Sequence, residues 1–183
     1  MIEINNLTSV PVDKNFLKKV AGKIIKKEKK LLVKEDKSSS SATESRLRDE
    51  GGKESEALFD SAAAQVELSI ALVGPAKIKK LNKEYRKKNK ITDVLSFLYS
   101  SEAKGEEERM FFDHNDAGEI VICPQQVKKN AGKYNSTFKK ELTRVLIHGI
   151  LHLLGEDHET SKLKAKKMEE KEEYYLSQIL NAK

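Results

Sequence analysis

The 183-residue sequence has a single cysteine, four histidines and no long hydrophobic run. The lone cysteine, Cys123, excludes an internal disulfide and fits a reducing compartment. No stretch approaches the roughly 20 apolar residues of a membrane-spanning helix. The first thirteen residues also lack the cationic start and apolar run of a signal peptide. These absences predict a cytoplasmic protein with no membrane partner; an organelle is the alternative compartment.

Hydrophobic residues are also scarce, at 38%, whereas charged residues reach 35%. The length suits one domain, residues 1–183, large enough to bury its own core. Residues 34–56 are serine-rich and charged, with few apolar side chains. Such a segment buries too little surface to offset its chain entropy, so we expect a disordered insertion there. Because residues 1–33 are too short to fold alone, the insertion interrupts one domain rather than separating two.

The net charge of +6 is concentrated in two stretches. Residues 18–37 contain nine lysines against three acids, and residues 77–90 contain seven lysines and Arg86 against Glu84 alone. Clustered cations favour a polyanionic partner such as RNA, through contacts with its phosphates. A solvated lysine-rich surface is the simpler alternative, and for the first stretch a basic amphipathic helix on a membrane surface is another.

Hydrophobic periodicity and turn residues predict both strands and helices. We expect strands at residues 1–6, 66–73, 91–99 and 118–123. Helices are expected after Asp13, Pro75 and Pro124, from Ser136 or Thr137 onward, and after His158. The first helix has an apolar stripe formed by Leu17, Val20, Ile24 and Leu31. The last helix has one formed by Leu163, Met168, Tyr175 and Ile179. Cys123 is expected to be a small buried residue rather than a nucleophile.

Three of the four histidines fall within eleven residues, His148-Gly-Ile-Leu-His152-Leu-Leu-Gly-Glu-Asp-His158. Residues four apart share one face of a helix, and Gly155 can end that helix and turn the chain back toward it. Zinc in a catalytic site takes three protein ligands and keeps one position for water or substrate. The spacing therefore predicts a metal site at His148, His152 and His158. A buried helix with unrelated imidazoles is the alternative, and His114 is expected to be an exposed loop residue rather than a fourth ligand.

The spacing of the three histidines is also that of metzincin zinc peptidases. Those enzymes need a glutamate directly after the first histidine as the general base, and this chain has Gly149 there. A peptidase with that mechanism is therefore disfavoured. Glycine costs roughly 1 kcal/mol relative to alanine inside a helix, so a close approach of backbone or substrate is expected at Gly149.

Three sequence blocks resemble the YbeY family of zinc-dependent endoribonucleases and ribosomal RNA maturation factors. The histidine segment resembles the family signature H-G-x-L-H-L-x-G-Y-D-H, with Glu156 in place of tyrosine. The block LNKEYRKKNKITDVLSF at 81–97 resembles LN-x-x-YR followed by TDVLSF, and GEIVIC at 118–123 resembles the family's GDI strand with Glu119 for aspartate. The resemblance covers most of residues 66–158 in the family's order.

The resemblance implies an α+β fold: a small mixed β-sheet with packed helices, and a metal-binding helix resembling that of zinc metallopeptidases. It further implies a single-strand-type endoribonuclease that uses one Zn²⁺ ion, with Arg86 as a catalytic residue. A planar guanidinium grips phosphate at two points and stabilises charge during phosphoryl transfer. Ribosomal RNA and the ribosome or its proteins are the implied partners, and no DNA is expected. Asp157 is expected either to orient a ligand imidazole or to cap a turn.

Two other functions stay open from the sequence. One is a non-catalytic, metal-stabilised ribosome assembly factor, which every feature except the open coordination position fits equally well. The other is a zinc peptidase, weakened by Gly149 and by the lysine-rich surface. The sequence assigns no general base, since nothing in it shows that nearby Glu159 faces the metal.

Overall fold

The computed structural model describes residues 1–39, 67–99, 117–156, 158 and 161–181. The elements follow the order β1 (Ile2–Asn6), α1 (Lys14–Ser39), β2 (Glu67–Leu72), α3 (Pro75–Arg86), β3 (Val94–Tyr99), β4 (Ala117–Ile122), α4 (Pro124–Lys133), α5 (Phe138–Leu153) and α6 (Lys162–Leu180). This is the α+β fold expected from the sequence. None of the helices in the described ranges is long and apolar enough to cross a membrane.

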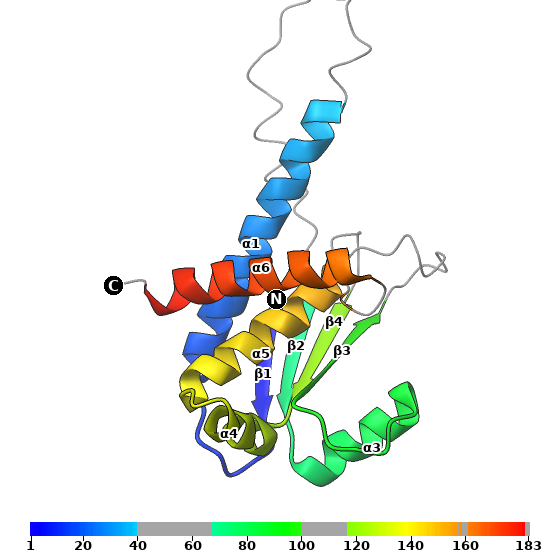
Figure 1. The fold of residues 1–183 in the computed structure, drawn as a ribbon, viewed down its shortest axis with the longest axis vertical. Coiled ribbons are helices and arrows are strands. Elements are labelled where there is room, and N and C mark those ends of the chain that lie inside the picture. The colour runs from blue at the N-terminus through cyan, green and yellow to red at the C-terminus, as the bar shows by residue number, and fades with distance from the viewer. Residues whose placement is uncertain (40–66, 100–116, 157, 159–160, 182–183) are drawn as a thin grey trace, which may run out of the picture.

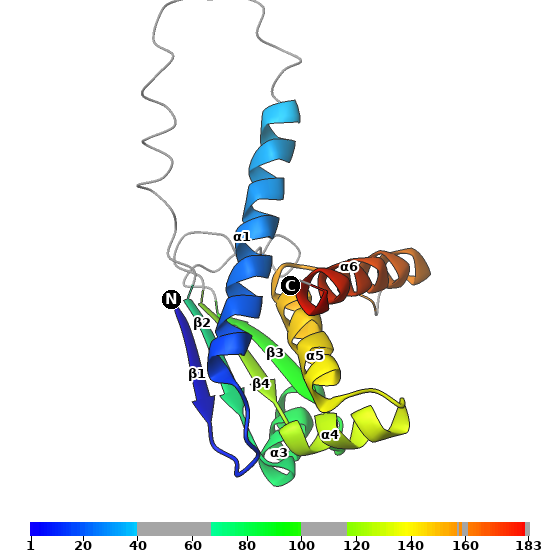
Figure 2. The same cartoon turned by 90° about the vertical axis from the view of Figure 1, so that its left-hand side faces the viewer.

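The four strands form one mixed sheet in the order β1-β2-β4-β3. β1 and β4 both pair with β2 in parallel, and β3 pairs with β4 antiparallel. Helices α1 and α5 lie side by side on one face of this sheet, and α6 lies across α5 (Figures 1 and 2). Strand β3 forms one edge of the sheet and contacts α5. Part of α5 therefore lies beside this edge.

The main core fills the space between the sheet and helices α1, α5 and α6. Its most buried members alternate along the strands and recur at helical spacing: Ile70, Leu72, Ile120 and Ile122 face Leu17, Ile24, Leu146, Ile147 and Ile150. A smaller cluster lies on the opposite face of the sheet beneath α3, formed by Val73, Ile78, Leu95, Val121 and Cys123. The described residues thus cover the second face only near α3, and along β2 buried residues alternate with partly exposed ones.

The helices begin where the sequence predicts. The side chain of Asp13 accepts from the backbone N–H of Phe16 at 2.9 Å, and that of Thr137 accepts from Lys140 at 3.1 Å, so both are N-caps. Pro75 and Pro124 stand in the first turns of α3 and α4. Local sequence signals therefore mark the start of four of the five helices in the described ranges. The fifth, α6, begins at an N-cap, Ser161, that the sequence analysis did not identify.

Two expected core residues are exposed instead. The C-terminal part of α1 extends beyond the sheet (Figure 1), and Leu31, in that half of the helix, is 43% exposed. Leu163 is 66% exposed because it lies in the first turn of α6, ahead of the buried Met168, Tyr175 and Leu176. Helix α1 also runs to Ser39, six residues into the segment where we expected the insertion; residues 40–56 of that segment, and His114, lie outside the described residues.

Candidate metal centre

Helix α5 holds two of the three histidines on a rigid support. Ten of its sixteen residues are buried, so the helix is fixed by the core along most of its length. His148 and His152 are half-buried on the one face that leaves the core. Their Nε2 atoms lie 3.1 Å apart and their ring centroids 4.6 Å apart. Two ligand nitrogens on a tetrahedral zinc ion are separated by about 3.3 Å, so this pair already has a ligand spacing.

A tight turn at Gly155 brings the third histidine back to α5. Gly155 has a φ of +84°, its N–H donates to His152, and the N–H of Glu156 donates to Leu151 at 3.0 Å. These two bonds form a Schellman cap, in which glycine adopts the left-handed conformation at no steric cost. His158 then lies with its ring centroid 5.2 Å from that of His148 and 5.0 Å from that of His152.

The three imidazoles form one donor set. One ring nitrogen from each lies within 4.8 Å of those of the other two, and no other such group occurs among the described residues. Imidazole suits zinc, copper, iron and nickel, so the donor chemistry fits a transition metal and not calcium or magnesium. With no fourth ligand among the described residues, the three histidines leave one tetrahedral position for water or substrate.

Helix α6 contributes an acidic partner that the sequence did not reveal. Nδ1 of His148 lies 2.6 Å from Oε1 of Glu172, whose side chain is 16% exposed. A carboxylate only accepts hydrogen bonds, so this contact favours the His148 tautomer that carries its proton on Nδ1 and keeps Nε2 available as a metal ligand. Glu172 is one of four glutamates within residues 169–173, and nothing in the spacing distinguishes it. Asp157 and Glu159, the acids considered from the sequence, lie outside the described residues.

Gly149 marks the closest approach of α5 to the sheet. A Cβ atom at this position would lie 3.0 Å from Cγ2 of Ile120 and 3.2 Å from Oγ of Ser96. The Ser96 hydroxyl also donates to the carbonyl oxygen of Gly149 at 3.1 Å. The expected close approach at Gly149 is therefore with strands β3 and β4. A larger side chain at this position would collide with the sheet. Glycine itself carries no group that could act as the peptidase base.

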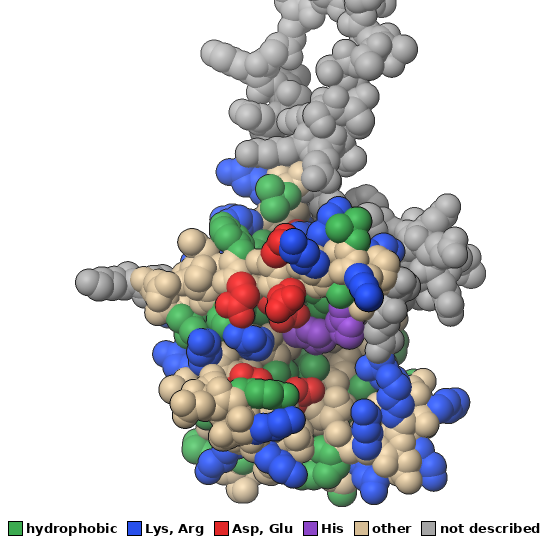
Figure 3. Space-filling view, viewed as in Figure 1, with side chains coloured by type: hydrophobic (Ala, Val, Ile, Leu, Met, Phe, Trp, Pro, Cys, Tyr) green, Lys and Arg blue, Asp and Glu red, His purple; other side chains and the backbone are tan. Residues whose placement is uncertain are grey.

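A cleft of about 310 Å³ opens beside the histidines. It is lined by Arg86 at the end of α3, by residues 94–98 of β3, and by His148, His152 and Leu153 of α5. The sequence-predicted Arg86 thus shares a cleft with two of the three histidines, although they are more than sixty residues apart in the chain. In Figure 3 the histidines lie at a hollow of the surface, with basic side chains gathered over α3 beside it.

The loop that carries His158 is tied to α6 and α1 through a polar network. Lys171 pairs with Glu156 and with Glu28, whose Oε2 lies 3.4 Å from its Nζ, and the Tyr175 hydroxyl donates to the other oxygen of Glu28. Burial opposes the charge on Lys171, but the two carboxylates outweigh it and raise the lysine pKa. Glu156 stands where the family signature has tyrosine. Through its ion pair with Lys171, it ties the loop that carries His158 to α6.

Cys123 takes no part in the cleft. It is fully buried in the small core under α3, and this burial raises the pKa of its thiol. A raised pKa disfavours the thiolate that a nucleophile needs, which confirms the expectation of a structural cysteine.

Comparisons with known proteins agree with the resemblance in the sequence blocks. The family model described as Endoribonuclease YbeY matches residues 23–180. The chain is 47% identical over 113 residues to Endoribonuclease YbeY of Thermodesulfovibrio yellowstonii, a match over 61% of this chain and 66% of that protein. It is 42% identical over 116 residues to Endoribonuclease YbeY of Thermotoga neapolitana, a match over 63% of this chain and 69% of that protein.

A solved structure resembles the whole fold. The solution structure of TM1509 from Thermotoga maritima matches with a TM-score of 0.53 and 29% sequence identity, over 99% of this chain and 90% of that one. The curated matches span about two thirds of the relatives' own length, while the family model extends over most of this sequence. From the three blocks, the fold and these matches, the chain belongs to the YbeY endoribonuclease family.

Proposed function

We propose that this chain is a zinc-dependent endoribonuclease that cleaves single-stranded RNA and works in ribosomal RNA maturation. The observation that carries the proposal is the meeting of His148, His152 and His158 within 4.8 Å beside a cleft that Arg86 also lines. The relatives are endoribonucleases by name, and this supports RNA as the substrate class. Ribosomal RNA, with the ribosome or its proteins, is the proposed partner and the cytoplasm the proposed compartment.

The three imidazoles would hold one zinc ion through one ring nitrogen each. When bound, zinc supplies Lewis acidity, which polarises a phosphoryl oxygen or lowers the pKa of a bound water. His148 contributes Nε2, because its Nδ1 is engaged by Glu172. The rigid, buried α5 keeps two donors in place before any metal arrives, so little ordering is needed on binding.

Arg86 is proposed to hold the phosphate next to the histidines. Its guanidinium stays charged at any physiological pH and offers paired donors that match phosphate oxygens. Lys79 and Lys83 precede it at helical spacing on α3, and both are exposed. Together these cations provide a track for the RNA backbone that leads to the cleft, where Arg86 stabilises charge developing on the reacting phosphate.

We also propose that residues 1–183 form a single YbeY-like domain with an insertion at 34–56. Strand β1, which precedes that segment, pairs with β2, which follows it, over five residue pairs from Ile2–Leu68 to Asn6–Leu72. Helix α1 likewise packs against α5 from the far end of the chain. The chain on both sides of the segment thus shares one sheet and one core, as an insertion within a domain requires.

The test combines metal analysis with cleavage. Purified protein is expected to contain about one equivalent of zinc, and zinc-loaded protein is expected to cut an unstructured ribosomal RNA fragment but not an unfolded protein substrate. His152→Ala should lose both metal and cleavage. Arg86→Ala should keep its zinc while cleavage falls by about 10²-fold or more, the usual loss when a group that stabilises transition-state charge is removed.

Lys133→Ala is the control for Arg86→Ala, because it also removes one cation but does not line the cleft. It should keep both zinc and cleavage. Zinc binding without cleavage of RNA would favour a non-catalytic assembly factor, cleavage of the protein substrate would favour a peptidase, and absence of any transition metal would refute the metal centre itself.

A further inference from the structure

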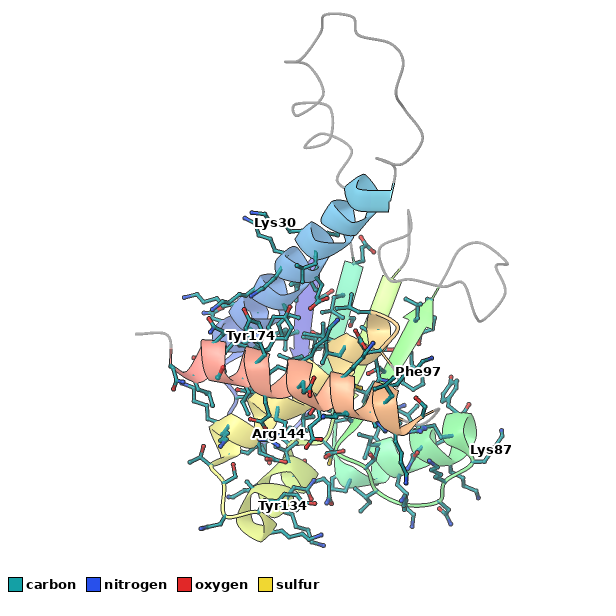
Figure 4. All side chains as sticks on the ribbon, turned by 45° about the horizontal axis from the view of Figure 1, so that its top comes forward. Lys30, Lys87, Phe97, Tyr134, Arg144 and Tyr174 are labelled. Carbon is teal, nitrogen blue, oxygen red and sulfur yellow. The ribbon has the colours of Figure 1, made fainter. Side chains whose placement is uncertain are left out.

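The histidine cluster is contacted from outside by α6, which lies across α5 (Figure 4). Two neighbouring residues of α6 make these contacts. Glu172 lies 2.6 Å from Nδ1 of His148, and Lys171 pairs with Glu156, two residues before His158. One turn of α6 therefore reaches both the helix and the loop that supply the metal-binding nitrogens.

We propose that Glu172 is a positioning residue of the metal centre, and that Lys171 supports it by anchoring the loop that carries His158. This inference rests on the proposed metal site. By accepting the proton of His148 Nδ1, Glu172 selects the tautomer whose Nε2 lone pair is free. The same bond fixes the ring rotation that points Nε2 toward His152, so the donor set is assembled before metal binds.

The packing of α6 explains why Glu172 and not its neighbour has this role. Glu173 pairs instead with Arg144, one turn before His148 on α5, at 2.8 Å, and 57% of its side chain is exposed. The Glu172 side chain is only 16% exposed and the His148 side chain 28%, so little water competes for their bond. A carboxylate held that far from solvent needs a strong donor, and the imidazole N–H of His148 is in place to supply it.

Lys171 is also held in a defined position. Its ammonium lies between Glu156 of the loop and Glu28 of α1, which is buried and also receives the hydroxyl of Tyr175. Glu156 follows the left-handed Gly155, so the pair with Lys171 fixes the chain direction just where it turns toward His158. Ligands supported in this way lose less conformational entropy on binding a metal.

The decisive measurement is zinc affinity, by competition with a chromophoric chelator. Removal of a group that orients a metal ligand typically weakens affinity by about 10- to 100-fold, and we expect Glu172→Ala to fall in that range. Glu172→Gln should lie between Glu172→Ala and the wild type, because its amide oxygen still accepts from Nδ1 but carries no charge. Glu173→Gln, the matched control one residue away, should remain within about twofold of the wild type, as expected for an exposed pair.

The tautomer of His148 supplies a second readout that needs no metal. In the zinc-free wild type, imidazole ¹⁵N spectra should show His148 protonated at Nδ1. In Glu172→Ala the same signals should shift toward the Nε2-protonated form, and Glu172→Gln should retain the wild-type pattern. A residue that only packs against α5 would leave this tautomer unchanged.

Circular dichroism of each variant shows whether it folds. If Glu172→Ala is unfolded, the test is the zinc affinity of the isosteric Glu172→Gln, which should be weaker than that of the wild type. Wild-type zinc affinity in both Glu172 variants, or an Nε2-protonated His148 in the wild type, would overturn the role of Glu172 while leaving the metal site intact. A wild-type protein that binds no zinc would overturn the metal site and this inference together.

Discussion

Replacing Gly149 by alanine places a methyl group where α5 touches the sheet. The new Cβ would lie 3.0 Å and 3.3 Å from two carbons of Ile120 and 3.2 Å from Oγ of Ser96. Ile120 is fully buried, so its side chain has little room to move aside. The helix must shift outward instead, and this also stretches the bond from Ser96 to the Gly149 carbonyl.

The expected loss of stability follows from opposing effects. Overpacking a core by one methyl group costs about 1–3 kcal/mol, and a weakened hydrogen bond adds up to about 1 kcal/mol. The better helix propensity of alanine returns about 1 kcal/mol. These contributions sum to about 0–3 kcal/mol, and from the middle of that range we expect Gly149→Ala to lower the free energy of unfolding by about 1–2 kcal/mol. For a protein of this size that lowers Tm by about 2 to 8 °C.

Thermal and urea unfolding, followed by circular dichroism, measure this change. Gly132→Ala is the matched control, since it makes the same substitution in α4 at a place with no atom within 4 Å of the new Cβ. It should be neutral or stabilise the protein by up to about 1 kcal/mol. If Gly149→Ala were as stable as Gly132→Ala, the close contact between α5 and the sheet would not explain the glycine, and the reasoning would be refuted.

Two further predictions follow from the charged groups. Burial and the Glu28 carboxylate raise the pKa of Tyr175 above its ordinary value, so the folded state holds this proton more tightly than the unfolded state and stability falls as pH rises above about 10. Tyr175→Phe should lower stability at pH 7, yet flatten the decline above pH 10 by about 1.4 kcal/mol per pH unit in urea titrations; an unchanged slope would contradict it. Lys79→Gln combined with Lys83→Gln should reduce the salt dependence of single-stranded RNA binding, measured by fluorescence anisotropy, by about 1.4 in log–log slope, and an unchanged slope would remove α3 from the RNA path.

Much of the fold was predictable because its signals are local. Strands such as β2 and β4 are short apolar runs bounded by Gly74-Pro75 and by Pro124. The N-caps Asp13 and Thr137 act within three residues, so their effect can be read from the chain alone. The exposure of Leu31 could not be read in this way, because it depends on where the sheet ends beneath α1 rather than on the helical periodicity of the stripe.

The metal-binding pattern was also local, but its surroundings were not. His148 and His152 share a helix face, and the glycine cap accounts for the return of His158, so spacing alone suggested the cluster. Glu172 reaches His148 only because α6 crosses α5, and a run of similar glutamates gives no sign of which one turns inward. Arg86 was indicated by family resemblance, since its charge alone is one among the eight basic residues of 77–90.

Gly149 also narrows where a general base can come from. The position after the first histidine is packed against Ile120 and Ser96, and its glycine carries no side chain that could take a proton. Among the described residues, those that line the cleft include no carboxylate. Glu172 does not line the cleft, and one of its oxygens is already bonded to His148. In this fold the glycine that lets α5 dock on the sheet also removes the peptidase base, so proton transfer must rely on a group outside α5 or on the RNA itself.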